Sequence, residues 1–207
     1  MGMDETETIR KRYDRVSKVY DFFEQPMEAL AFKKWRVLAF QDLKGKVLEV
    51  GVGTGKNIPY YPDDVDMTAI DFSEKMLAIA QEKAKGFHKK IQFILMDAQC
   101  MDFPDNVFDQ VITAFVFCSV PDPVKGLQEI RRVCKPDGKI IMIEHVRSEK
   151  KILGLIMDLF NPIPLHIYGA NINRRTVENL QKAGFVNIEV KNLMGDIVKK
   201  IVIDNVK

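Results

Sequence analysis

The sequence predicts an α/β domain built around a mostly parallel sheet, and three observations support this fold class. Short β-branched runs alternate with helical patterns from Lys46 onward, which is typical of strands joined by helices. A glycine-rich turn follows the first run, where a strand must give way to a helix. The last two runs are separated only by Met194, Gly195 and Asp196. Because so short a connection favours an antiparallel hairpin, we expect a parallel sheet that ends in one.

The composition is that of an ordinary folded domain. The chain has 207 residues, of which 46% are hydrophobic and 29% are charged, and this excludes the collagen-like and fully disordered classes. Lysine and arginine number 31 against 29 acidic residues, so the formal net charge is +2. A dedicated nucleic-acid-binding protein carries a larger basic excess. We therefore expect one domain and no nucleic-acid partner.

The cysteines and histidines indicate neither a disulfide framework nor a metal site. The three cysteines, Cys100, Cys118 and Cys134, are odd in number and form no CxxC pair. The three histidines, His88, His145 and His166, are too widely spaced to be metal ligands on one element. The N-terminus lacks the apolar block of a signal peptide. The longest apolar stretch, 152–168, is interrupted by Asp158 and two prolines, so we expect a cytoplasmic protein without a membrane-spanning helix.

The expected elements follow in order along the chain. Residues 9–42 have helical periodicity, with Pro26 able to begin a second helix. The core strands are expected at 47–50, 67–71, 91–97, 108–117 and 139–145. Between them, a helix capped by Ser73 runs to Lys85, and another opens at Pro123 and closes before a turn at 136–138. A last helix near 176–183 ends at Gly184, and the final strands are expected at 186–193 and 197–203.

These elements predict a single domain, 1–207, in four parts. Residues 1–44 form an N-terminal helical cap, and 45–145 form the core that carries the glycine loop. Residues 146–175 are an insertion expected to build a pocket for a second substrate, and 176–207 hold the last helix and the hairpin.

The glycine loop LEVGVGTGKN does not fit the two common phosphate-binding motifs. Its glycines are Gly51, Gly53 and Gly55. A dinucleotide-binding fingerprint needs a glycine where Lys56 stands, and a P-loop needs a Ser or Thr where Asn57 stands. The loop therefore predicts a nucleoside ligand that is held without phosphate contacts.

An acid stands at the end of each of the first three strands: Glu49, Asp71 and Asp97. At this edge of a parallel sheet, Asp71 can accept both hydroxyls of a ribose. Asp97 can accept from the exocyclic amine of adenine, and Met76 can contact the ring. A ligand with a ribose, a base and a cationic head but no phosphate is S-adenosylmethionine, which we expect as the cofactor.

The motifs resemble those of the class I S-adenosylmethionine-dependent methyltransferases over nearly the whole chain. LEVGVGTGKN is similar to their first motif, AIDFSEKML to the ribose motif, and MDAQCMDFPDNVFDQV to the adenine motif. The resemblance implies a Rossmann-like, seven-stranded sheet with an antiparallel last strand and helices on both faces, and S-adenosylhomocysteine as the product. It also implies that Glu49 supports the loop, that Ala98 offers its backbone to adenine, and that Phe72 and Phe115 belong to the cofactor site.

Two variable regions indicate the methyl acceptor. YDRVSKVYDFFEQP resembles the opening of the ubiquinone/menaquinone C-methyltransferases and the phosphatidylethanolamine N-methyltransferases, which implies that Tyr13 and Tyr20 touch the cofactor. GANINRRT resembles a segment of the phospholipid-type enzymes and of alkyl-thiol methyltransferases. A phospholipid headgroup amine is the leading acceptor, with a quinone-precursor carbon or a small thiol as alternatives and a noncatalytic cofactor-binding protein as the non-enzyme alternative. The oligomeric state is left open.

The same regions carry the candidates for lipid contact and catalysis. Apolar residues of the insertion can accept a lipid: Ile152, Leu155, Ile156, Leu159, Phe160 and Ile163. The flanking basic residues can hold the phosphate of that lipid: Lys150, Lys151, Arg174 and Arg175. Basic residues within 9–20 predict reversible contact with an anionic membrane. For deprotonation of an amine, His145 is the candidate base and Tyr20 a candidate positioning group.

Overall fold

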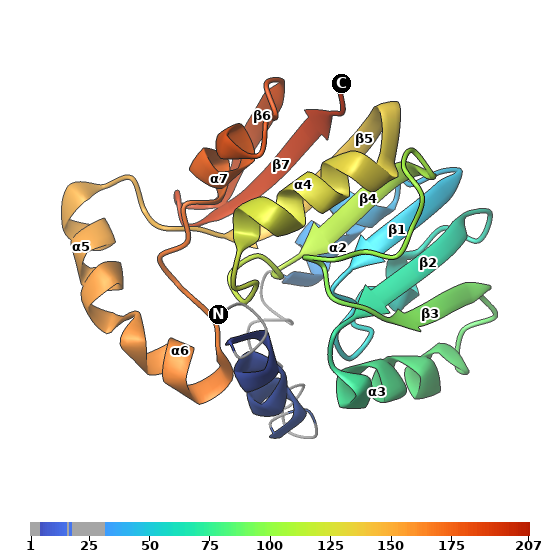
Figure 1. Cartoon of the computed structure of the whole chain (residues 1–207), viewed down its shortest axis with the longest axis horizontal. Coiled ribbons are helices and arrows are strands. Elements are labelled where there is room, and N and C mark those ends of the chain that lie inside the picture. Colours follow the sequence, from blue (N-terminus) through green and yellow to red (C-terminus); the bar gives the residue numbers. More distant parts are fainter. Residues whose placement is uncertain (1–4, 16, 18–31) are drawn as a thin grey trace.

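The computed structural model describes residues 5–15, 17 and 32–207, and its centre is a seven-stranded sheet (Figure 1). The spatial order of the strands is β3-β2-β1-β4-β5-β7-β6. Their bounds are β1 Lys46–Val50, β2 Asp66–Asp71, β3 Ile91–Leu95, β4 Phe108–Ala114, β5 Cys134–His145, β6 Ile188–Met194 and β7 Val198–Asp204.

The first five strands are parallel and the last two are antiparallel. β1 pairs with β2 and β4, β2 with β3, and β4 with β5, all in parallel. β7 lies antiparallel between β5 and β6. This confirms the predicted fold class, and it brings the carboxyl ends of β1 to β5 to one edge of the sheet.

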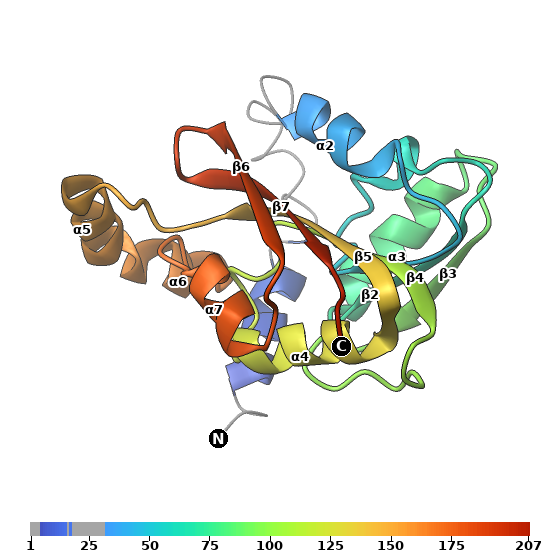
Figure 2. The same cartoon turned by 90° about the horizontal axis from the view of Figure 1, so that it is seen from above.

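Helices cover both faces of the sheet (Figure 2). On one face, α2 (Lys33–Phe40), the short η2 (Ile58–Tyr60) and α3 (Glu74–Ala84) pack over one apolar cluster, to which Phe40, Ile58 and Leu77 belong. On the other face, α4 (Pro123–Val133) and α7 (Thr176–Lys182) cover a second cluster, with Leu127 and Leu180 at its centre. Alternate side chains of the buried strands point into each cluster, so the sheet has the two-faced core of an α/β protein.

The predicted cap at Ser73 is present, and the helix that was expected to open at Pro123 is capped by Asp122. The Ser73 Oγ accepts from the backbone N–H of Met76 at 3.2 Å at the start of α3. Asp122 caps α4 in the same way, accepting from the N–H of Lys125 at 3.0 Å. Each cap satisfies an N–H group that has no partner within its helix, which fixes where the chain leaves the sheet edge.

Several strand ends differ from the prediction, and two of these differences have a backbone cause. β4 stops at Ala114, three residues early, because Phe115 adopts a left-handed conformation with φ of 60°. β5 begins early, at Cys134, and the predicted turn at 136–138 is an irregularity inside it, where Asp137 has φ of 62°. Aspartate tolerates this conformation better than most residues, so it stands in for a glycine.

The insertion after β5 forms two helices, α5 (Lys151–Phe160) and α6 (Pro162–Tyr168), which extend beyond the end of the sheet in Figures 1 and 2. A helix at residues 5–15 connects them to the core: Arg12 donates to the carbonyl of Leu165 at 2.5 Å, and the buried Ile9 packs on Gly169. The second predicted helix start, at Pro26, lies outside the described residues. Within the described residues, no helix is both long and apolar enough to cross a membrane.

Candidate active site

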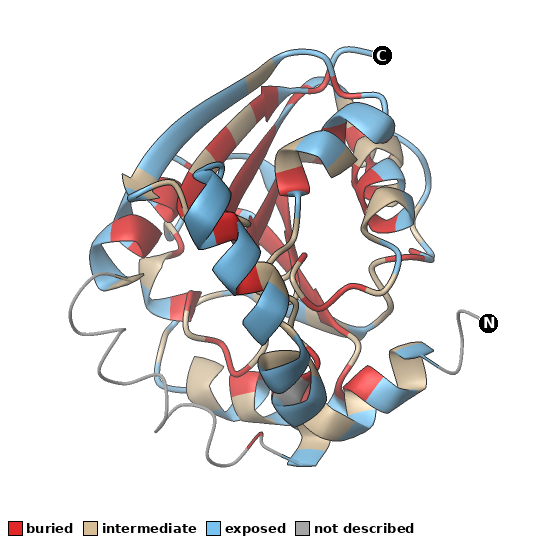
Figure 3. Cartoon of the chain, turned by 90° about the vertical axis from the view of Figure 1, so that its left-hand side faces the viewer, coloured by how far each residue is buried: buried red, intermediate tan, exposed pale blue. Residues whose placement is uncertain are grey.

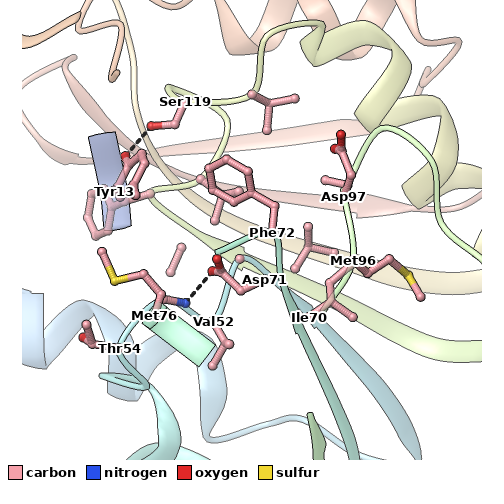
Figure 4. A pocket seen from close by; sticks show the side chains of 18 of the residues that line it. Tyr13, Val52, Thr54, Ile70, Asp71, Phe72, Met76, Met96, Asp97 and Ser119 are labelled. Atoms are coloured by element: carbon pink, nitrogen blue, oxygen red, sulfur yellow. Dashed lines mark hydrogen bonds between the residues drawn. The ribbon is translucent and has the colours of Figure 1, made fainter. Parts of the chain in front are cut away.

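A cavity opens at the carboxyl edge of the sheet, where the ends of β1 to β4 meet the N-terminal helix (Figure 4). Of the predicted cofactor residues, nine line it: Tyr13, Gly51, Gly53, Asp71, Phe72, Met76, Asp97, Ala98 and Phe115. Residues far apart in the sequence therefore meet around one hollow, because parallel strands bring their carboxyl ends together.

The three glycines of the loop have different surroundings. All have positive φ, with 74° at Gly51, 55° at Gly53 and 77° at Gly55. A Cβ on Gly53 would meet nothing within 4 Å, whereas a Cβ on Gly55 would lie 2.6 Å from Ile58 and 3.1 Å from Ala80. Gly53 thus exposes its backbone to the cavity, while Gly55 does not line it and instead allows the loop to pack against α3.

The carboxylate of Asp71 is fixed by backbone donors. Its two oxygens accept from the N–H of Gly53 at 2.8 Å and of Ser73 at 2.9 Å. Burial raises the pKa of Asp71 to about 6, against the effect of these hydrogen bonds. At neutral pH the group is mostly ionised, and each oxygen keeps lone pairs that can accept from a pair of neighbouring hydroxyls.

Asp97 lines the cavity together with Gln99, a residue that the sequence analysis did not single out. Asp97 accepts from the N–H of Gln99 at 2.8 Å and from its side-chain amide at 3.1 Å. The Gln99 amide also donates to Thr6 of the N-terminal helix at 3.1 Å, and its oxygen accepts from the N–H of Asp122. Gln99 thereby links Asp97 to the N-terminal helix and to the start of α4.

The N-terminal helix lies over the cavity. The Tyr13 hydroxyl is 2.5 Å from the Oγ of Ser119, and its ring meets Phe72 edge-on at 5.9 Å (Figure 4). At the next residue, Asp14 accepts from the Ser73 hydroxyl at 2.5 Å. These bonds fasten the helix to both sides of the opening. Tyr20 lies outside the described residues.

Glu49 lies under the glycine loop and does not line the cavity. It is fully buried and accepts from the Asn57 side-chain amide and the Tyr61 hydroxyl. Burial raises the pKa of Glu49 from 4.5 to about 8, so the carboxyl is largely protonated at neutral pH. Because Asn57 does line the cavity, Glu49 positions the loop through it.

The raised pKa of Glu49 predicts a pH-dependent stability. Between 4.5 and about 8 the folded state keeps a proton that the unfolded state releases, so stability falls as the pH rises, by at most about 1.4 kcal/mol per pH unit. Glu49→Gln removes this dependence and keeps the side chain's size. Urea unfolding at about pH 6 and about pH 8 should therefore show a smaller loss for Glu49→Gln than for the wild type. Equal losses would show that Glu49 is ionised in the folded protein.

Arg36 is a cavity residue that the sequence analysis missed. Only 4% of it is exposed, its guanidinium donates to the Asn57 side chain, and it lies 5.9 Å from the centre of the Phe115 ring. The one sequence signal is that Arg36 shares the buried face of α2 with Trp35, Ala39 and Phe40. A buried charge needs a partner of opposite sign or several acceptors, and here the guanidinium borders the cavity.

Glu144 is a second buried acid near the cavity. It accepts from the Thr113 hydroxyl at 2.8 Å and from the N–H groups of Phe117 at 3.2 Å and Val116 at 3.3 Å. Burial raises its pKa to about 7. Since Val116 lines the cavity, Glu144 holds the loop after β4 in place.

His145 is the last residue of β5 and is not among the side chains that line the cavity. Its pKa is lowered, mainly by burial, while a hydrogen bond with the backbone of Ile172 acts in the opposite direction. Its Nδ1 is buried and has no hydrogen-bond partner among the described residues. Burial therefore favours the neutral form of the imidazole.

Two of the basic residues predicted to hold a phosphate have partners within the protein. Arg174 is turned inward and donates to the carbonyls of Cys118 and Val120, and Arg175 forms an ion pair with Glu178. Lys150 and Lys151 are exposed at the start of α5. The phosphate contact stays a prediction.

The known proteins that this chain resembles are methyltransferases. A family model described as a methyltransferase domain matches residues 48–142. The chain is 36% identical over 156 residues to a phosphatidylethanolamine N-methyltransferase of Cereibacter sphaeroides, covering 73% of this chain and 75% of that protein. It is 28% identical to a demethylmenaquinone methyltransferase of Staphylococcus aureus, covering 92% of this chain and 87% of that protein.

Solved structures show the same fold. A Thermotoga maritima structure described as an S-adenosylmethionine-dependent methyltransferase, possible histamine N-methyltransferase, superposes with a TM-score of 0.70 at 20% identity, covering 94% of this chain and 99% of that one. The chain is therefore an enzyme of the class I S-adenosylmethionine-dependent methyltransferase family, with S-adenosylmethionine as cofactor and S-adenosylhomocysteine as product.

Proposed function

We propose that this enzyme transfers the methyl group of S-adenosylmethionine to the amine of a phospholipid headgroup of the phosphatidylethanolamine type. The observation that carries this proposal is the 36% identity to the phosphatidylethanolamine N-methyltransferase over three quarters of that protein's length. The apolar insertion next to the N-terminal helix supports it, because a lipid acceptor requires an apolar approach to the cofactor.

The cavity suggests how the cofactor lies. We propose that Asp71 accepts the two ribose hydroxyls, with its oxygens held by Gly53 and Ser73. Asp97 and the backbone of Ala98 then face the adenine, and Met76 and Phe72 lie against it. We propose that the methionine part lies against the open side of Gly53, with the sulfonium toward the Tyr13 end of the cavity.

Arg36 completes this arrangement as the partner of the cofactor's carboxylate. Its guanidinium is a buried cation that borders the cavity beside the glycine loop. An arginine can hold a carboxylate through two parallel hydrogen bonds. We therefore propose that Arg36 binds the methionine carboxylate and that Asn57 orients the guanidinium.

Arg36→Gln is expected to weaken S-adenosylhomocysteine binding by about tenfold. Its affinity for 5′-methylthioadenosine should not change, because that nucleoside has no carboxylate. Calorimetry with both ligands measures the two effects, and Lys34→Gln on the exposed side of α2 is the matched control. If both ligands lose affinity equally, Arg36 only supports the fold of the cavity.

Methyl transfer from a sulfonium is an in-line displacement that needs alignment and exclusion of water. A headgroup amine with a pKa of about 10 must lose a proton before it attacks. We propose that loss of water around the ammonium in the closed site lowers its pKa. His145 as base and Tyr20 as positioning group stay predictions.

The direct test supplies methyl-labelled S-adenosylmethionine to the enzyme with vesicles that contain phosphatidylethanolamine. The expected result is label in a lipid that migrates as N-methylated phosphatidylethanolamine. Parallel reactions contain demethylmenaquinone or a small thiol in place of this lipid. Transfer to the quinone precursor alone would replace the proposal with C-methylation, which the 28% identity over 92% of the chain supports. Cofactor binding without transfer to phosphatidylethanolamine would refute the proposed acceptor.

A further inference from the structure

The two helices of the insertion turn apolar side chains outward. Five residues at helical spacing along α5 and α6 form what we name the α5–α6 apolar face: Ile152, Leu155, Ile156, Leu159 and Ile163, which are 76%, 56%, 46%, 74% and 56% exposed. In Figure 3, which faces α5, the helix is exposed along most of its length. An ordinary surface helix buries its apolar stripe against the core, whereas these helices expose theirs to solvent.

Polar residues on the opposite side hold the helices in this orientation. Asp158 of α5 accepts from the guanidinium of Arg147 at 2.7 Å and 3.0 Å. Asn161, between the helices, accepts from the N–H of Ile172 at 2.8 Å and donates to Asn171 at 3.0 Å. Because these hydrogen bonds hold the polar side chains toward the core, the apolar face points outward.

The charges around the face favour an anionic surface as its partner. Lys150 and Lys151 are exposed at its start. Between Lys150 and Gly169 the sequence has one acid, Asp158, and that carboxylate is paired with Arg147. An apolar stripe edged by exposed lysines matches the interfacial layer of a phospholipid bilayer, where side chains of this kind enter the acyl region and lysines stay among the phosphates.

The N-terminal helix is less suited to this role than its sequence suggests. Arg10 and Lys11 form ion pairs with Glu7. Arg12 donates to the carbonyl of Leu165 in α6. The helix that lies over the cavity is therefore fastened to the back of the apolar face, so a surface that holds α6 also lies near the opening.

We propose that the α5–α6 apolar face docks this enzyme on a phospholipid bilayer, with α5 and α6 lying in the plane of the interface and Lys150 and Lys151 at the headgroups. The proposal deepens the function proposed above and rests on it for the choice of a lipid surface. α5 has 10 residues, far below the about 20 needed to span a membrane.

The test is sedimentation with vesicles of phosphatidylcholine, with and without phosphatidylglycerol. The variant Ile152→Asn/Leu155→Asn/Leu159→Asn should lose vesicle binding by about tenfold or more. The control Leu95→Asn/Val186→Asn removes two other exposed apolar side chains and should bind as the wild type does. Lys150→Ala/Lys151→Ala should lose mainly the gain that phosphatidylglycerol provides. Unchanged S-adenosylhomocysteine affinity shows that each variant is folded.

Three results would each overturn the docking proposal. One is a wild-type protein that does not bind either kind of vesicle, and another is a triple variant that binds as tightly as the wild type. The third is a wild-type dimer that the triple variant converts to a monomer, since the face would then join two copies. Activity on short-chain phosphatidylethanolamine in detergent micelles separates the two proposals. Methylation in micelles without vesicle binding would refute only the docking proposal. Vesicle binding without methylation would refute only the proposed methyl acceptor.

Discussion

Asp71→Asn should weaken S-adenosylhomocysteine binding by about a hundredfold, the largest effect that we expect from one substitution. Two hydrogen bonds from the ribose to a charged acceptor would be lost, each contributing about 1.4 kcal/mol or more. The amide would also turn a donor toward the N–H of Gly53 or Ser73, both of which now donate to the carboxylate. Isothermal titration calorimetry measures the change.

Asp66→Asn is the matched control, because Asp66 starts the strand that Asp71 ends and its side chain is exposed. This variant should bind the ligand as the wild type does. If Asp71→Asn retains wild-type affinity while it stays folded, the ribose does not lie on Asp71 and the orientation proposed for the cofactor is incorrect.

Gly53→Ala should weaken cofactor binding by about thirtyfold. The backbone at Gly53 is left-handed, and a Cβ there would point into open space at the cavity. A methyl group in the volume that the ligand fills costs about 2 kcal/mol. The left-handed conformation itself costs an alanine about 1 kcal/mol in folding stability, so the affinity must be separated from the stability.

The chain offers a close control for this purpose. Gly195, in the β6–β7 turn, has φ of 54°, and a Cβ on it would likewise meet nothing within 4 Å. Gly195→Ala should lose as much stability as Gly53→Ala and no cofactor affinity. Thermal unfolding and calorimetry of both variants give the comparison. Equal affinities would mean that the ligand does not pass over Gly53.

Local patterns predicted the sheet and much of the cavity. Ser73 and Asp122 cap helices with hydrogen bonds that span only a few residues, and such signals are visible in sequence. Asp71 ends β2 and Asp97 follows β3, and the parallel arrangement of these strands brings the two side chains to one cavity. Glycine spacing was less informative, because Gly53 opens to the cavity while Gly55 relieves a contact with Ala80, and one pattern of glycines serves both purposes.

Features that depend on long-range packing could not be predicted. Arg36 reaches the cavity only because α2 packs beside η2, where Asn57 meets it. The apolar residues of α5 have a spacing that fits a buried helix as well as an exposed one. Their outward orientation follows from the pairing of Asp158 with Arg147, which sequence spacing does not determine.

A crystal structure of the enzyme with S-adenosylhomocysteine tests the central claim most directly. We expect the ribose hydroxyls within hydrogen-bond distance of both oxygens of Asp71, the adenine beside Asp97 and the carboxylate against Arg36. A nucleoside bound with its ribose away from Asp71, or outside the cavity at the carboxyl edge of the sheet, would contradict it.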